Sequence, residues 1–144
     1  MRLRVDTDRA LSPSQQIVEA VLDAVASGEL RAEARLPSVR EAAAAALVNP
    51  NTVARAWRDL EALGVVEGRA GSGVFVTEGG PEVARRERRK ATLAALRVAA
   101  EEALRAGHAS ETVLEETRRA IERDGEGTRR EAKTGGPEGK GGRR

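Results

Sequence analysis

The chain contains no cysteine, and its 144 residues include only one Trp, one Phe and no Tyr. Without cysteine it can form neither a disulfide nor a thiolate metal site, which fits a protein kept in a reducing cytosol. It also lacks any apolar run near the ~20 residues that a membrane-spanning helix needs. Its N-terminus carries charges where a signal peptide would be apolar. We therefore expect a cytoplasmic protein with no membrane partner and an aliphatic core.

Residues that could carry out catalysis are also missing. His108 is the only histidine, and it lies in a Gly-His-Ala break between two expected helices. No acidic residues have a metal-ligand spacing with histidine or cysteine. Ser72 stands between glycines in an expected hairpin, which is the wrong context for a nucleophile elbow, and no P-loop motif follows it. The sequence predicts no enzyme, no cofactor and no metal site.

The charge is small overall but uneven along the chain. The formal net charge is +2. Residues 1–80 hold 9 Arg and 11 acidic residues, a net of −2, whereas residues 81–144 hold 16 Lys or Arg and 12 acidic residues, a net of +4. The first half can therefore bind nucleic acid only through a local cluster of arginines on one face.

Three helices are expected in the first half of the chain. Residues 12–15 and 38–41 both read Ser-x-x-Gln/Glu, the capping-box spacing that begins a helix. Gly28 is placed to end the first helix, and the second runs to about Leu47. A third helix extends from Asn49 to about residue 64. Its buried face is expected at positions three and four apart, namely Val53, Ala56, Trp57 and Leu60.

Two short valine-rich strands, 65–67 and 74–76, enclose a glycine-rich tip and predict a β-hairpin. The connection at residues 30–36 has room for a very short strand. Helix, turn, helix with a polar N-terminus and then hairpin is the order of a winged helix-turn-helix, a DNA-reading fold. The predicted fold class is mainly α with a small β-hairpin: an N-terminal winged helix-turn-helix and a short C-terminal helical dimerisation segment.

The beginnings of the second and third helices have side chains that suit DNA. Asn51 can pair with a base, most naturally adenine, while Thr52 suits a phosphate or thymine methyl and Arg55 suits guanine or phosphate. Ser38 offers a hydroxyl and N–H groups to a phosphate, and Arg40 can contact the backbone or a guanine. In the hairpin, glycines permit close approach and an arginine adds charge. The predicted DNA-binding residues are Ser38, Arg40, Asn49, Asn51, Thr52, Arg55, Arg69, Gly71, Ser72 and Gly73.

Each of these residues taken singly is equally well an ordinary helix cap, a turn residue or a solvated polar side chain. Their joint order along the chain favours DNA binding. The basic run at residues 85–90 has two interpretations, since it could follow the phosphate backbone or form a solvated helix face.

The second half of the chain predicts two amphipathic helices, one at about residues 82–106 and another after a cap at Ser110. Two such helices cannot fully bury their apolar faces on each other, so they need the first domain or a second copy of themselves. The predicted homodimer contacts are Leu93, Leu96, Ala100, Leu104, Val113, Leu114 and Ile121.

The chain is thus expected to have three parts. A winged helix-turn-helix domain occupies residues 1–78, and a two-helix dimerisation segment occupies residues 79–124. Residues 125–144 contain seven glycines, six Lys or Arg and no large apolar residue, which predicts a disordered basic tail. Its cations could attract DNA or simply keep the end of the chain soluble.

Residues 12–76 resemble the DNA-binding domain of GntR-family transcription regulators. The similar pieces are Gln16-Ile17, Ser27-Gly28-Glu29-Leu30, residues 35–41 (RLPSVRE), Thr52-Val53, residues 60–66 (LEALGVV) and residues 71–76 (GSGVFV). The form of residues 49–57 resembles the YtrA branch, whose short C-terminal segment of two helices serves dimerisation. The resemblance implies a homodimer that binds an inverted repeat, usually as a repressor.

The resemblance is uneven at two positions that often touch DNA. Many members of the family have arginines where this chain has Pro50 and Ala54. Arg55 is placed to replace one of these contacts in part. The resemblance therefore supports Arg40, Asn51, Thr52 and Gly71 best, and base specificity is expected to differ from that of members with both arginines.

The sequence thus predicts a sequence-specific DNA-binding transcription regulator, a homodimeric repressor of a double-stranded DNA operator with an inverted repeat. The alternatives are a winged-helix protein-interaction module and a non-specific DNA-binding protein. Since the C-terminal segment has almost no aromatic residues to build a pocket, any small-molecule effector site is expected to be weak, at the dimer interface or absent.

Overall fold

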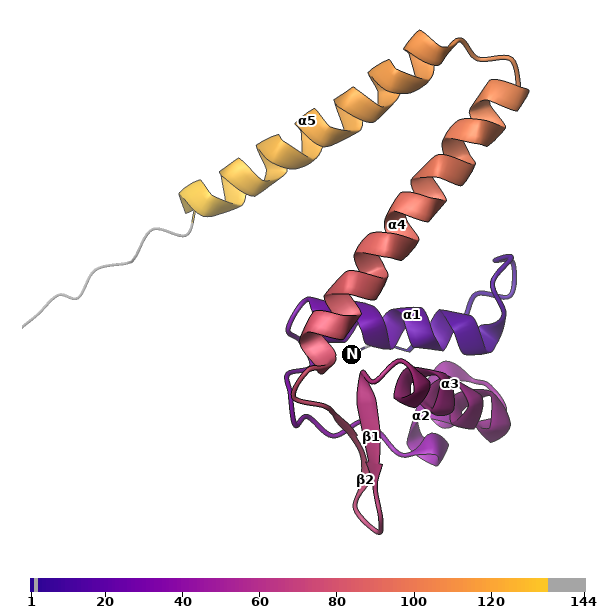
Figure 1. Ribbon diagram of the computed structural model, residues 1–144, viewed down its shortest axis with the longest axis vertical. Helices are drawn as coiled ribbons and strands as arrows, with labels where there is room; N and C mark the ends of the chain where they lie inside the picture. Colours follow the sequence, from indigo (N-terminus) through magenta and orange to yellow (C-terminus); the bar gives the residue numbers. More distant parts are fainter. Residues whose placement is uncertain (2, 135–144) are drawn as a thin grey trace, which may run out of the picture. The chain divides into compact units, whose positions relative to one another are not determined.

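The computed structural model describes residues 1 and 3–134 of the chain, with side chains up to residue 123. The chain divides into two compact units, Met1–Ala94 and Ala95–Arg144. Mostly helical elements and one two-stranded hairpin confirm the winged helix fold class (Figure 1). The elements are α1 (Pro13–Ala26), α2 (Val39–Ala46), α3 (Pro50–Ala62), β1 (Val66–Arg69), β2 (Gly73–Val76), α4 (Gly80–Arg105) and α5 (Ser110–Thr134).

Helices α1, α2 and α3 begin where the sequence predicts, because each has a side-chain cap. Reciprocal capping boxes join Ser12 to Gln15 at α1 and Ser38 to Glu41 at α2. At α3, the Asn49 side-chain oxygen accepts a hydrogen bond from the backbone N–H of Asn51 at 2.8 Å. These caps order the first turns of α2 and α3, where the predicted DNA contacts lie.

Leu47 ends α2 in a conformation that few residues adopt. Its φ of 54° and ψ of 45° are left-handed, which costs a residue with a Cβ ~1–2 kcal/mol, and the residue is 92% exposed. Glycine adopts this backbone freely but loses ~0.5–1 kcal/mol more entropy on folding. Leu47→Gly is therefore expected to raise the free energy of unfolding by up to about 1 kcal/mol in urea denaturation.

Leu63 provides the matched control for that substitution. It caps α3 with a right-handed φ of −75°, so glycine relieves nothing there and Leu63→Gly should lower the free energy of unfolding. An equal loss of stability in both variants would show that Leu47 stores no strain.

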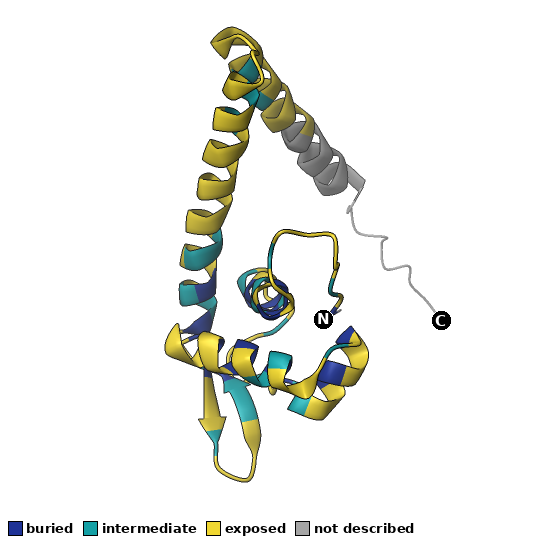
Figure 2. Ribbon diagram, turned by 90° about the vertical axis from the view of Figure 1, so that its right-hand side faces the viewer, coloured by how far each residue is buried: buried dark blue, intermediate teal, exposed yellow. Residues whose placement is uncertain are grey.

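The core of the first unit is aliphatic. Ile17 and Val21 of α1 cluster with Val53 and Leu60 of α3, and none is more than 1% exposed. Trp57 is also buried in this cluster, so the predicted buried face of α3 is confirmed. Figure 2 shows the buried residues on α1, α3, the hairpin and the first turns of α4. With so few aromatics, the core depends on close packing of small side chains.

The hairpin is extended by the segment before α2. Strands β1 and β2 pair antiparallel, with Val66 opposite Val76 and Arg69 opposite Gly73. Arg35 forms an isolated antiparallel bridge with Phe75. The Leu36 N–H donates to the Val74 carbonyl and the Val76 N–H to the Ala34 carbonyl, both at 2.9 Å. The short strand expected in residues 30–36 is therefore present as a bridge that ties the hairpin to the N-terminus of α2.

The first turns of α4 belong to the N-terminal unit. At Gly80, a Cβ atom would lie 2.5 Å from the Val65 carbonyl oxygen, and Ala84 is fully buried. Farther along, the Arg88 guanidinium forms ion pairs with Asp23 and Glu19 of α1. The compact unit consequently extends to Ala94, past the predicted domain end at residue 78, because the first part of α4 packs on the winged helix.

The second unit contains the end of α4 and α5. Gly107, with φ of +93°, ends the turn between them. Helix α5 runs to Thr134, past residue 125 where the predicted tail begins, and residues 135–144 lie outside the described part. Adding a residue to an existing helix costs far less than starting one, which lets α5 pass through two glycines. Among the described residues, no helix is long and apolar enough to cross a membrane.

Candidate nucleic-acid interface

Helix α3 separates a buried face from a polar one. Val53 and Ala56 are fully buried, whereas Asn51 and Arg55 are exposed and Thr52 is half-buried. The helix therefore presents these three polar side chains from its first turns while its apolar face anchors it. Asn49 uses its side-chain oxygen for the cap, which leaves only its amide group to donate elsewhere.

The N-terminus of α2 is partly occupied by its own capping box. The Ser38 N–H donates to Glu41 Oε2 at 2.7 Å, and Ser38 Oγ accepts from the Glu41 N–H at 3.3 Å. The hydrogen bond from the Ser38 side chain is the main cause that lowers the pKa of Glu41, so this carboxylate is charged at neutral pH. The free N–H group expected at Ser38 is thus engaged, while the exposed Arg40 remains available beside it.

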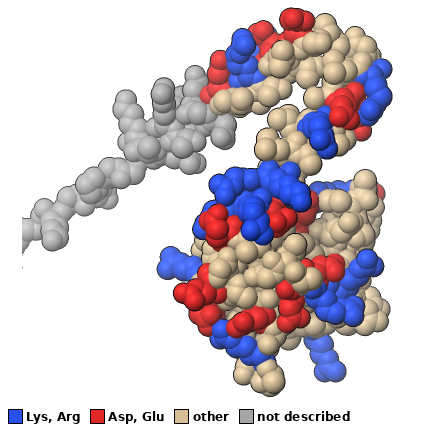
Figure 3. All heavy atoms as spheres, viewed as in Figure 1, with Lys and Arg blue, Asp and Glu red and all other residues tan. Residues whose placement is uncertain are grey.

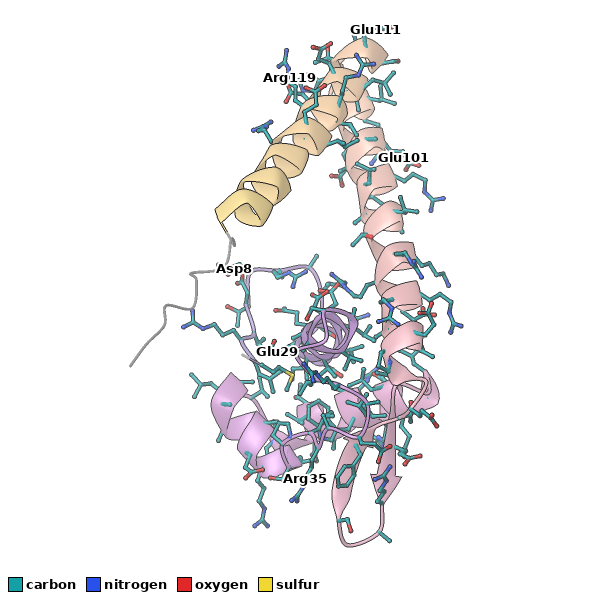
Figure 4. The ribbon with its side chains drawn as sticks, turned by 90° about the vertical axis from the view of Figure 1, so that its left-hand side faces the viewer. Asp8, Glu29, Arg35, Glu101, Glu111 and Arg119 are labelled. Carbon is teal, nitrogen blue, oxygen red and sulfur yellow. The ribbon has the colours of Figure 1, made fainter. Side chains whose placement is uncertain are left out.

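Arg35 is a site residue that the sequence did not single out. A Cβ atom at Gly73 would lie 3.0 Å from Arg35 Nε, and Gly73 has φ of +112°. Arg35 therefore lies against β2 near the tip of the hairpin, three residues before the Ser38 cap, and Figure 4 shows it beside the hairpin. Its cationic charge just before a helix cap was the available signal, but only the bridge to Phe75 reveals its contact with the hairpin.

Arg69 stabilises the hairpin. Its Nη2 lies 2.7 Å from Glu33 Oε2 and 2.8 Å from Glu67 Oε1, and its guanidinium carbon lies 4.7 Å from the centre of the Phe75 ring. Hydrogen bonds to Glu33 and then Glu67 raise the pKa of Arg69. Two carboxylates thus offset the positive charge that the sequence predicts for contact with DNA.

The tip of the hairpin is open. Gly71, Ser72 and Gly73 are all exposed. Gly71 has φ of +71° and its Cβ position has no neighbour within 4 Å, while the Ser72 N–H closes the turn by donating to the Arg69 carbonyl at 2.9 Å. The tip can therefore approach a ligand through its backbone.

Four unpaired arginines of the first unit lie on α2 and α3 or just before α2. Arg35, Arg40, Arg55 and Arg58 are exposed and form no ion pair with the described side chains. The acidic balance of residues 1–80 thus does not prevent a local cationic surface, because several acidic groups are used in caps and ion pairs elsewhere.

The basic run at residues 85–90 is largely paired with acids. Arg85 and Arg89 contact Glu82, and Arg86 contacts Glu87. Figure 3 shows the blue Lys and Arg atoms beside red acidic atoms over the first half of α4. Glu82 has its pKa lowered, chiefly by its hydrogen bond with Arg85. This pairing favours the interpretation of the run as a solvated, self-neutralising helix face.

The predicted dimer residues are mostly uncovered. In the part of the chain that the structure describes, Leu93, Leu96, Leu104, Leu114 and Ile121 are exposed large hydrophobic residues, while Ala100 and Val113 are half-buried. Within the second unit, an open hollow of about 270 Å³ lies between α4 and α5, with Leu96, Ala100, His108 and Val113 among its walls. These helices therefore present apolar surface that one copy does not bury.

Comparisons with known proteins agree with this arrangement. Residues 13–76 match the profile of the gntR family of bacterial regulatory proteins. The transcriptional repressor YtrA of Bacillus subtilis is 32% identical over 76 residues, which are 53% of this chain and 58% of that protein. The chain spans roughly half to two thirds of the length of the curated relatives it matches.

Two solved structures extend the similarity beyond the winged helix. A transcriptional regulator from Oenococcus oeni is 30% identical, with a TM-score of 0.61, over 81% of this chain and 99% of that one. YtrA from Sulfolobus acidocaldarius, a GntR-family transcription factor, is 28% identical, with a TM-score of 0.52, over 67% of this chain and 98% of that one. These relatives are regulators rather than enzymes. Residues 13–76 therefore form a winged-helix DNA-binding domain of the gntR family of bacterial regulatory proteins, and the relatives named YtrA support its place in the YtrA-like branch.

Proposed function

We propose that this protein is a homodimeric repressor that binds an inverted-repeat operator in the cytoplasm. The observation that supports this most directly is the group of unpaired arginines beside the capped first turns of α2 and α3. A helix whose N-terminal residues face outward beside such charges suits the major groove. The name of the Bacillus relative, a repressor, supports the sign of regulation.

The roles of the individual residues follow from their positions. Asn51 and Arg55 read base edges in the major groove, while Thr52 and Arg40 contact the backbone or a neighbouring base. The hairpin tip at residues 71–73 approaches the adjoining minor groove through its backbone. Arg69 holds the hairpin in shape through Glu33 and Glu67, and Arg35 adds charge between hairpin and α2.

Dimerisation is proposed through the apolar surface of α4 and α5. A second copy would cover the exposed leucines and Ile121, and two copies related by a twofold axis would present two α3 helices to DNA. Twofold symmetry in the protein then requires an inverted repeat in the operator. The hollow in the second unit is small and open, so no effector is assigned to it.

Selection of bound sequences from a random duplex pool, at two salt concentrations, tests this function. An enriched inverted repeat is expected, with affinity that falls as salt rises. Binding without enrichment would indicate a non-specific DNA-binding protein. Absence of binding at low salt would instead support a winged-helix protein-interaction module.

Arg55→Ala tests the base-reading role. The substitution is expected to weaken binding to the selected operator by about 1–3 kcal/mol, roughly 5- to 150-fold, and to relax the preference at one base pair of each half-site. Fluorescence anisotropy with a panel of single-base variants measures both effects. Arg9→Ala, which removes an arginine paired with Glu19, is the control and should bind as the unmodified protein does. Unchanged operator affinity in Arg55→Ala would reject this role.

A further inference from the structure

A hollow of about 450 Å³ lies between α3 and the hairpin. Helix α3 supplies Asn51, Ala54 and Arg58 to one wall, and Val74 of β2 lies on the opposite side. The hollow therefore separates the helix proposed for the major groove from the hairpin proposed for the minor groove. Val39, Trp57 and Glu61 complete the lining, and this mixture of two opposite charges, an amide and apolar groups differs from a closed, mostly apolar ligand pocket.

We infer that this hollow receives the sugar–phosphate strand between the two grooves, and that Arg58 binds a phosphate of that strand. The inference rests on the proposed function. Adjacent major and minor grooves of a duplex are separated by one backbone strand, so a protein that enters both must accommodate that strand between its two elements. A concave surface with a cation meets this requirement.

Arg58 is placed to make this contact. Positions 51, 54 and 58 lie on one side of α3, because helical neighbours are spaced by three and four residues. Ala54 is small and leaves space along this side for a backbone to approach. Arg58 is exposed and forms no ion pair with the described side chains, which distinguishes it from Arg69. Its long side chain can therefore turn toward a phosphate without breaking an existing contact.

Glu61 is the other charged group in the hollow, and it is already engaged. Its Oε1 accepts a hydrogen bond from the Gly68 N–H of β1 at 2.9 Å. The carboxylate thereby ties the hairpin to α3 and preserves the width of the hollow. Because it also offsets one positive charge, we expect the hollow to bind a single phosphate through Arg58 rather than a longer stretch of backbone.

The experiment uses the full chain and the duplex chosen by selection. Arg58→Ala, Arg58→Lys and the control Arg105→Ala are compared over a range of salt concentrations. Arg105 is an exposed arginine of the second unit with no ion pair among the described side chains. In addition, each backbone phosphate in one half-site is replaced in turn by an uncharged methylphosphonate. Thermal unfolding verifies that the exposed substitution at Arg58 leaves the fold intact.

The expected result is a tenfold or larger loss of affinity for Arg58→Ala and a salt slope that is less steep by about 0.9, the value for one phosphate. Arg58→Lys should keep the salt slope of the unmodified protein. The selected DNA sequence should be the same for both variants as for the unmodified protein. One methylphosphonate position should weaken the unmodified protein and Arg105→Ala but not Arg58→Ala.

Three other results would overturn the inference in different ways. If Arg58→Ala binds with the affinity and salt slope of the unmodified protein, Arg58 makes no contact. If the selected sequence changes at one position while the slope stays, Arg58 reads a base instead. If the unmodified protein selects no duplex at all, the proposed function itself fails, and the inference fails with it.

Discussion

Replacing Leu114 and Ile121 together with glutamate is expected to produce a monomer that binds the full operator roughly 10²–10⁴-fold more weakly. Both residues are largely exposed, at 64% and 68%, so the charges should not disturb the fold of one copy. They would instead be buried without partners in the proposed dimer, which is unfavourable. Because two linked half-site contacts then become independent, most of the affinity disappears. Analytical sedimentation measures the change from dimer to monomer, and fluorescence anisotropy measures the loss of operator affinity.

A control of equal charge separates dimerisation from electrostatics. Arg118→Glu also changes the net charge of α5 by −2, by removing one positive charge and adding one negative charge at an exposed position, and it should leave the dimer and most of the affinity intact. Binding to a duplex with one half-site should be similar for all variants. A double glutamate variant that sediments as a dimer and retains operator affinity would show that these residues are outside the interface.

Gly80→Ala is expected to lower the free energy of unfolding by about 1–3 kcal/mol. The added Cβ would lie 2.5 Å from the Val65 carbonyl oxygen and 2.9 Å from Val76 Cγ1. The carbonyl belongs to the backbone and cannot turn away, so the start of α4 must move from the hairpin. For a domain of this size, each kcal/mol corresponds to a fall in Tm of about 4–8 °C.

The neighbouring glycine provides a close control. Gly79 has no atom within 4 Å of its Cβ position, so Gly79→Ala should leave the Tm nearly unchanged. Operator binding should fall in Gly80→Ala only to the extent that the fold is lost. Equal melting temperatures for Gly80→Ala and the unmodified protein would mean that α4 does not pack tightly against the hairpin.

The helices of the winged domain could be predicted because their signals are local. A capping box needs only residues three apart, and the buried face of α3 follows from its spacing, so Ser12, Ser38 and Val53 were sufficient to place them. The hairpin could also be predicted from the sequence, since two short valine-rich segments lie on either side of a glycine-rich turn. The assignment to the gntR family agreed with these local features.

The features that the sequence did not reveal depend on residues far apart in the chain. Arg69 looks like a free cation, but Glu33, 36 residues earlier, pairs with it. Arg35 is identified as a site residue only because its backbone forms a bridge with Phe75 of β2. The clash at Gly80 likewise arises from Val65 and Val76. The residue pattern of a single helix or strand does not predict such contacts. The roles of these residues could therefore be identified only from the three-dimensional structure.

The bridge between residues 34–36 and β2 also has a consequence for how the domain acquires its shape. Strand β2 forms hydrogen bonds with β1 on one side and with residues 34–36 on the other. Residues 34–36 precede β2 by about 40 positions and lie between α1 and α2. The hairpin is therefore part of the same cooperative unit as the helices. The amides of Leu36 and Val76 should exchange with solvent only when the whole domain opens. A chain that has lost its helical packing should lose α3 and the hairpin, the two elements proposed to contact DNA, at the same time, so partly folded molecules should not bind the proposed operator.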